Sequence, residues 1–126
     1  MIADIVINSG AYTEPFETRA IYTDFPSRMS LKWEQLHDGD EKSSYYLLEL
    51  DKVSGVVTVR RSGEYKSLLV FDTSCSTVGQ IVTPYGEIPV AINTEYIKVP
   101  TVLFPGVEIS YFMGEEKNVF SVVIKG

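Results

Sequence analysis

The chain has 126 residues and a formal net charge of −6, from 11 basic and 17 acidic side chains. With 44% hydrophobic residues it is long enough to bury the core of one domain. The cations are scattered apart from the adjacent Arg60 and Arg61, whereas proteins that bind phosphate backbones gather them, so neither nucleic acid nor a membrane is an expected partner. No apolar run reaches the ~20 residues of a membrane helix.

Alternation of apolar and polar residues is the dominant pattern, and it predicts short β-strands. The clearest case is the stretch "GEIPVAIN", where Ile88, Val90 and Ile92 share one face. In chain order the predicted strands cover residues 2–8, 16–25, 28–37, 43–51, 56–61, 65–72, 77–83, 86–93, 95–99, 106–114 and 118–126. Residues 27–36 also place Met29, Trp33 and Leu36 at helical spacing, so one helix there stays an open alternative.

Turn-forming residues separate these strands at roughly ten-residue spacing, which is typical of an all-β sandwich or barrel. Closing the sheet removes the unpaired edges that promote aggregation. An immunoglobulin-like sandwich is the rival, but its two-cysteine pattern is absent, since the chain has one cysteine. We therefore predict a single domain over residues 1–126, folded as a closed or nearly closed antiparallel up-and-down barrel of about ten strands.

A set of spaced residues in the second half of the chain also matches a known family. The set comprises Arg61, Gly63, the "TPYG" turn with Thr83, Tyr85 and Gly86, then Thr94, Tyr111 and Asn118. In these features the chain resembles the YwiB-like family, small bacterial domains of unknown function with a calycin-like (lipocalin-like) β-barrel. The resemblance implies this fold, and it implies no activity, because fold does not supply function. It also implies a more aliphatic pocket here, because Ile81 replaces a common aromatic of the family.

The two adjacent arginines are the main functional clue. Arg61 shares the parity of Val57 and Val59, which is the more apolar one, so Arg61 is expected to face inward and Arg60 solvent. A buried guanidinium needs an acceptor, and three interpretations remain open. Arg61 could bond loop carbonyls or a carboxylate such as Glu64 or Asp72 at the rim. It could instead be an internal strut held by a carboxylate or a Tyr hydroxyl, or it could anchor an anionic ligand head group.

The sequence contains little that indicates a catalytic or a metal-binding site. His37 and Cys75 are far apart in sequence and suggest no nucleophile–base pair. Asp38, Asp40 and Glu41, in the polar turn with His37, lack the ligand pattern of a calcium loop and indicate a solvated turn. Neither a metal nor a cofactor is therefore expected. The single cysteine and the lack of a signal peptide predict a cytoplasmic protein.

The leading hypothesis is a non-catalytic binding module that holds a small apolar or amphipathic ligand inside the barrel. Arg61 would meet the polar end of that ligand, with its body near Trp33 and Tyr111. The alternative is a filled barrel that acts through its outer surface as a protein-interaction or structural module, with a homodimer as one form of it. The first hypothesis predicts an internal cavity that opens at one end, and the second predicts an exposed apolar patch.

Overall fold

The chain folds into ten antiparallel strands without a helix in the described part of the chain. A computed structural model describes residues 1–10, 14–63 and 65–125. The strands are β1 (Ile2–Ser9), β2 (Phe16–Asp24), β3 (Arg28–Gln35), β4 (Ser44–Asp51), β5 (Val57–Gly63), β6 (Lys66–Phe71), β7 (Thr77–Thr83), β8 (Gly86–Lys98), β9 (Gly106–Met113) and β10 (Glu116–Ile124).

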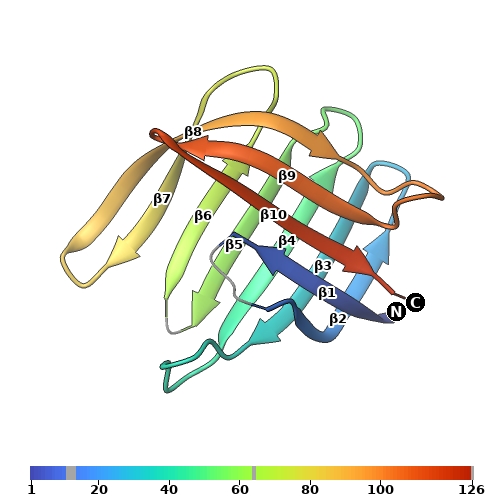
Figure 1. Ribbon diagram of the computed structural model, residues 1–126, viewed down its shortest axis with the longest axis horizontal. Coiled ribbons are helices and arrows are strands. Elements are labelled where there is room, and N and C mark those ends of the chain that lie inside the picture. Colours follow the sequence, from blue (N-terminus) through green and yellow to red (C-terminus); the bar gives the residue numbers. More distant parts are fainter. Residues whose placement is uncertain (11–13, 64, 126) are drawn as a thin grey trace.

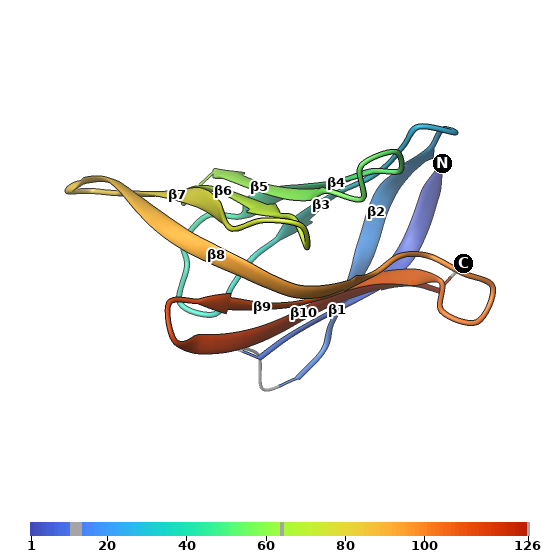
Figure 2. The same cartoon turned by 90° about the horizontal axis from the view of Figure 1, so that it is seen from above.

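Each strand pairs with the next one along the chain, and β10 pairs with β1 to close the barrel (Figures 1 and 2). The closed barrel confirms the expected fold class and excludes the sandwich. The helical alternative for residues 27–36 is wrong, because Arg28–Gln35 form strand β3. None of the described residues forms a helix long and apolar enough to cross a membrane.

One strand differs from its prediction. Two predicted strands, 86–93 and 95–99, form the single thirteen-residue strand β8. Its pairing with β9 shifts between Thr94 and Tyr96, where a β-bulge adds one residue. A bulge bends a strand and lets it continue in a new direction, so β8 extends along the barrel as one curved element (Figure 2).

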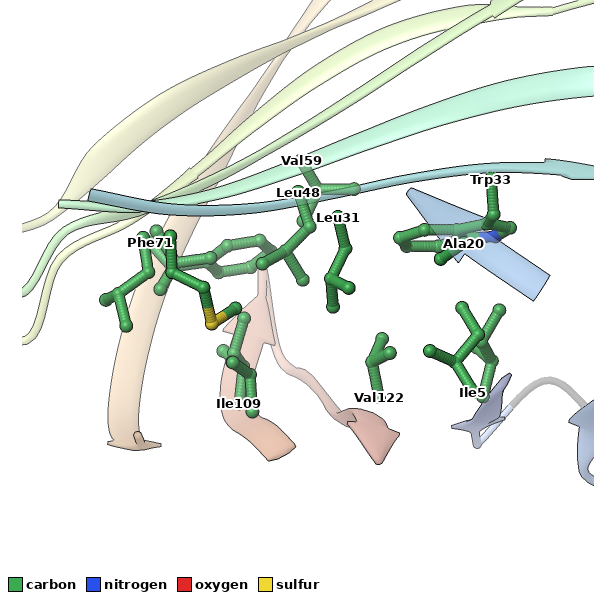
Figure 3. Close-up of a cluster of buried hydrophobic side chains, with 14 of the residues drawn as sticks. Ile5, Ala20, Leu31, Trp33, Leu48, Val59, Phe71, Ile109 and Val122 are labelled. Atoms are coloured by element: carbon green, nitrogen blue, oxygen red, sulfur yellow. The ribbon is translucent and has the colours of Figure 1, made fainter. Parts of the chain in front are cut away.

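Inward-facing apolar side chains from most of the strands fill the middle of the barrel (Figure 3). Leu31, Leu48, Ile109 and Val122 are fully buried, and each comes from a different strand. Burying one such side chain contributes roughly 1.5–3 kcal/mol. This apolar cluster is the structural reason for the alternating sequence pattern, because successive residues of a strand face opposite sides of the wall.

The inward-facing residues of β8 become more exposed toward the β7–β8 hairpin. Along β8 the inward positions change from Ile92, which is fully buried, through Val90, which is half-buried, to Ile88, which is 49% exposed. Ile88 pairs with Ile81 of β7 at this open end. We call the open end the mouth of the barrel. Both chain termini lie at the opposite end (Figure 1).

Candidate functional site

Three inward-facing side chains of neighbouring strands form a row near the mouth. Trp33 of β3 pairs with Tyr46 of β4, and Tyr46 pairs with Arg61 of β5. The same row continues through Ser67 to Ile81 at the mouth. The register therefore brings Trp33 and Arg61, two of the predicted ligand-binding residues, onto one stretch of the inner wall.

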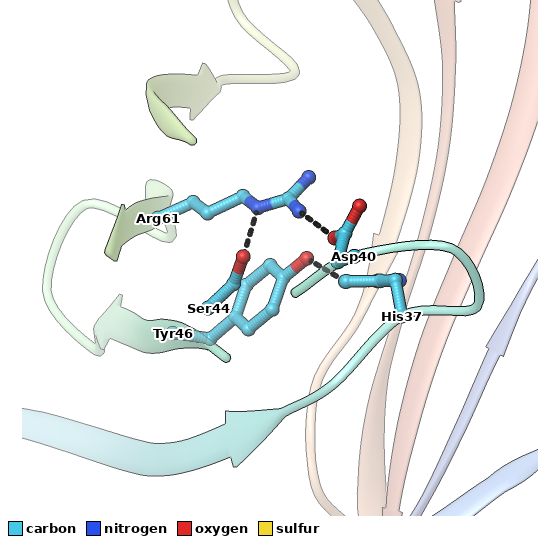
Figure 4. Close-up of polar contacts among 5 residues, drawn as sticks. All are labelled: His37, Asp40, Ser44, Tyr46 and Arg61. Atoms are coloured by element: carbon cyan, nitrogen blue, oxygen red, sulfur yellow. Dashed lines mark hydrogen bonds and ion pairs between the residues drawn. The ribbon is translucent and has the colours of Figure 1, made fainter. Parts of the chain in front are cut away.

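Arg61 points into the barrel and is surrounded by polar and aromatic groups (Figure 4). Its Nε donates a hydrogen bond to Ser44 Oγ at 2.9 Å, and its Nη2 lies 3.7 Å from Asp40 Oδ2. Its guanidinium carbon lies 5.5 Å from the ring centre of Tyr46 and 5.0 Å from that of Tyr65. The side chains of Arg61 and Asp40 are only 23% and 14% exposed. Arg61 is thus a sheltered cation with one sheltered carboxylate beside it.

The structure shows which carboxylate contacts Arg61. Asp72 accepts hydrogen bonds from Ser74 and Cys75 and forms no ion pair with Arg61, which pairs with Asp40. Glu64 lies outside the described residues. The contacts with Ser44 and Asp40 fit both the rim and the internal-strut interpretations, because Asp40 lies in a turn near the mouth. They leave Nη1 of Arg61 without a hydrogen bond to the described residues.

The segment 36–43, between β3 and β4, is fastened to this row at two points. His37 Nε2 lies 2.6 Å from Tyr46 Oη, and Asp40 faces Arg61 (Figure 4). Burial is the main cause that lowers the pKa of His37, and the charge of Arg61 lowers it further. The Tyr46 ring stacks on Trp33 with centroids 5.2 Å apart. The turn predicted to be solvated therefore contributes two side chains to the inner wall.

Tyr111 and Thr94 make a second polar spot on the far wall of the barrel. The two residues are paired between β9 and β8. The Tyr111 ring packs on Phe71 with centroids 4.7 Å apart, and burial raises the pKa of its hydroxyl. Phe71 pairs with Val57, two inward positions further from the mouth than Arg61. Tyr111 therefore lies deeper than the Arg61 row, and the structure does not place it in that row.

Thr94 carries an unsatisfied buried atom. Its Oγ1 is inaccessible to solvent and has no hydrogen-bond partner among the described residues. Buried hydroxyls nearly always have a partner, so an exception calls for a bound water or ligand atom, or for a specific explanation.

The remaining residues of the predicted structural motif serve turns. Gly63 has a φ of +99°, and a Cβ there would lie 2.6 Å from the carbonyl oxygen of Ser43, so only glycine fits. Thr83 Oγ1 donates to the Gly86 carbonyl at 2.8 Å and accepts from the Tyr85 amide. The Tyr85 side chain is fully exposed. The "TPYG" residues thus shape the β7–β8 turn and do not contact the Arg61 row.

Sequence reasoning missed four residues around Arg61: Asp40 as its ion-pair partner, with Ser44, Tyr46 and Tyr65. Ser44 and Tyr46 had a signal, because they share the inward parity of Leu48 and carry polar groups on it. Asp40 had none, because it lies in a turn. In residues 1–10, 14–63 and 65–125, no group of three or more His, Cys, Asp or Glu side chains could hold a metal ion.

A groove of about 540 Å³ lies on the outer surface of the barrel. It crosses strands β1 to β5, and exposed apolar side chains, Ile2, Ile21 and Tyr45, line part of it. An exposed apolar patch is what the hypothesis of a function at the outer surface predicts, and that hypothesis stays a prediction. The site residues of the outer surface were not predicted.

Comparisons with known proteins agree with the fold. A search of curated proteins gives no match. The crystal structure of the ywiB protein from Bacillus subtilis superposes with a TM-score of 0.73 and 22% sequence identity, covering 99% of this chain and 88% of that one. The family model described as "Domain of unknown function (DUF1934)" matches residues 16–121. These findings confirm the YwiB-like resemblance, and the chain belongs to this DUF1934 family.

Proposed function

We propose that the chain is a non-catalytic binding protein that holds one small amphipathic molecule in the mouth of the barrel, with an anionic head group on Arg61. The observation that supports this most is the state of the Arg61 guanidinium. It is sheltered, it faces inward, and Nη1 is free of hydrogen bonds to described residues. Its only carboxylate partner there stands at 3.7 Å, which is longer than an N–H···O hydrogen bond.

A head group with two oxygens suits this site. The planar guanidinium fork matches carboxylate or phosphate oxygens in pairs. Asp40 lies 3.7 Å from Nη2, so a ligand carboxylate would bind beside it at Nη1. The Tyr46 and Tyr65 rings would keep their contacts with the guanidinium.

The inner wall supplies the apolar half of the site. Between the mouth and the filled middle, Leu69, Val90 and Tyr111 are partly buried and pack against the core. Ligand sites are commonly apolar concavities with a few polar groups, and the mouths of β-barrels are one of their usual places. A polar group at the inner end of the ligand body would also give the unsatisfied hydroxyl of Thr94 a partner.

The proposal includes two further expectations. We infer that the barrel is of the calycin type. Lipocalins, which belong to this type, hold one small ligand inside a closed barrel, as proposed here for the mouth. We also infer a cytoplasmic location, because the exposed Cys75 is unpaired and a reducing compartment suits such a thiol.

Native mass spectrometry of the chain purified from its own host tests the proposal. We expect a bound small molecule on the wild type and on Arg28→Gln, and its loss from Arg61→Gln. Arg28 is the matched control because it is an exposed arginine at the other end of β3, outside the Arg61 row and outside the outer groove. Circular dichroism checks that both variants fold. A wild-type chain at its bare mass, or a ligand that survives Arg61→Gln, contradicts the proposal. A doubled mass without ligand would favour the outer-surface alternative.

A further inference from the structure

The outer groove lies where two strands of the barrel wall part. Strands β2 and β3 are paired from Ile21 to Asp24 with Met29 to Lys32. The pairing does not continue to the stretches 16–20 and 33–35, although the structure describes both. Ala20 and Trp33, which face inward, line the groove together with outward-facing residues. The groove therefore reaches from the outer surface into the gap between the two strands.

The groove is apolar along one line. Ile2 pairs with Ile21, Ile21 pairs with Lys32, and Lys32 pairs with Leu47. Ile2 and Ile21 are 69% and 54% exposed. An apolar line of this kind on a solvent-facing wall has no role in the core, and exposed apolar patches commonly mark binding sites.

The charges at the groove favour an anion. Among the described residues that line it, Arg19, Lys32 and Arg60 are cationic and only Glu34 is a carboxylate. Arg19 is 3.6 Å from Asp4 in an exposed ion pair. Lys32 and Arg60 make no ion pair with the described residues. The groove therefore carries a local excess of positive charge, although the net charge of the chain is −6. Electrostatic attraction at the groove favours the binding of an anion over that of a cation.

Lys32 and Arg60 are arranged to share one head group. Leu47 pairs with Lys32 on one side and with Arg60 on the other. Since adjacent strands are about 4.8 Å apart, the two backbones are separated by roughly 10 Å. Both side chains are long and flexible enough to meet above Leu47. An anionic group placed there would continue into an apolar chain along Ile21 and Ile2.

We propose that this groove is a second binding site, which takes a single-chain amphiphile with an anionic head group. The head group lies between Lys32 and Arg60, and the apolar chain follows Ile21 and Ile2 across β2 and β1. A volume of about 540 Å³ is within the usual range for small-molecule sites. The head-group end of this site is separate from Arg61, because Lys32 and Arg60 face outward, although Trp33 and Tyr46 of the inner row also line the groove.

A titration of the ¹⁵N-labelled chain with decanoate, below its micellar concentration, tests the site. We expect shifts of the amide signals of β2 to β5 around Ile21, Lys32 and Leu47. Decyltrimethylammonium, which has the same chain and the opposite charge, is expected to bind at least tenfold more weakly. The comparison of the two probes distinguishes the contribution of the head-group charge to binding from the contribution of the apolar chain.

Variants then assign the head group. Lys32→Gln/Arg60→Gln is expected to weaken decanoate binding at least tenfold. Lys42→Gln/Lys66→Gln removes the same charge outside the groove and is expected to leave it within twofold. Equal binding of the two probes overturns the proposal. So does decanoate binding that survives the groove variant but is lost in Arg61→Gln, because the amphiphile would then occupy the mouth. Binding to anionic lipid vesicles without any response to decanoate overturns it as well.

Discussion

Arg60 and Arg61 are neighbours in sequence but lie in opposite environments. Arg61 faces inward, bonds Ser44 and faces Asp40 between two tyrosine rings. Arg60 faces outward, lines an open groove and has no ion pair among the described residues. The one difference between them is which side of the wall they face, because successive side chains of a strand point to opposite faces. The pair shows how one strand can serve two surfaces with the same residue type.

The same contrast applies to whole faces of the sheet. On the inner face, apolar groups are buried and the cation is partnered. On the outer face, apolar groups and cations remain exposed to solvent. Equal changes to the two faces should therefore have unequal effects, and three experiments measure the difference.

The largest effect is expected from the adjacent residues Leu48 and Leu47. Leu48 is fully buried in the core, whereas Leu47 is half-buried on the outer wall. Leu48→Ala leaves a cavity and should lower the free energy of unfolding by about 2–5 kcal/mol. Leu47→Ala should cost less than about 1.5 kcal/mol, because less apolar area is lost. Urea denaturation followed by tryptophan fluorescence measures both, and equal losses would mean that the inner face is not the core.

An intermediate effect is expected at the two arginines. Arg61→Met removes the partner of the sheltered Asp40 and the donor to Ser44, and should cost roughly 1–3 kcal/mol. Arg60→Met changes a solvent-facing side chain and should stay within about 0.5 kcal/mol. Adding Asp40→Asn to Arg61→Met should recover part of the loss, since no unpaired charge remains. The midpoints of denaturant unfolding measure these losses of stability. If the loss in the double variant equals the sum of the losses in Arg61→Met and Asp40→Asn, Asp40 and Arg61 do not interact.

The smallest effect is expected from the titration of His37. Burial and Arg61 lower its pKa from the ordinary value of 6.5, although Asp40 and Asp38 oppose this. As the pH falls below about 6.5, the unfolded chain binds a proton that the folded chain resists, so stability decreases. Above that pH, His37 is neutral in both states and contributes no slope. Thermal unfolding between pH 5 and 7.5 should show this slope in the wild type. It should be shallower in His37→Gln, and an identical slope would contradict the role of His37.

Most of the fold could be predicted from the sequence, because alternation and turn residues report local geometry. The predicted strand 86–93 shows it, since Val90 and Ile92 of its expected face are more buried than Pro89 and Ala91. Closure was predicted only from the general cost of open edges. The bulge at Thr94 was not predicted. One added residue interrupts the alternation of apolar and polar residues, and in the sequence this looks the same as the end of one strand and the start of another.

The site could be predicted only in part. Parity alone indicated that Arg61 faces inward, and the register then placed it near Trp33. The partner Asp40 depends on the course of a turn, and no periodicity reports that. The groove depends on which outward residues of β1 to β5 become neighbours, and on where β2 leaves β3. Both are consequences of register and bending, which a single sequence does not reveal.

The pairing of β1 with β10 joins segments from opposite ends of the chain, from Ile5 with Ile124 to Ser9 with Phe120. A ribosome therefore releases β1 long before its second neighbour exists. Until then the emerging meander carries two open edges, which are sites for mistaken association with other nascent chains. Sealing the ring is a late and non-local event, of the kind that slows the folding of β-proteins. Strand β1 is thus synthesised before the other strands but completes its pairing only after β10 has been made.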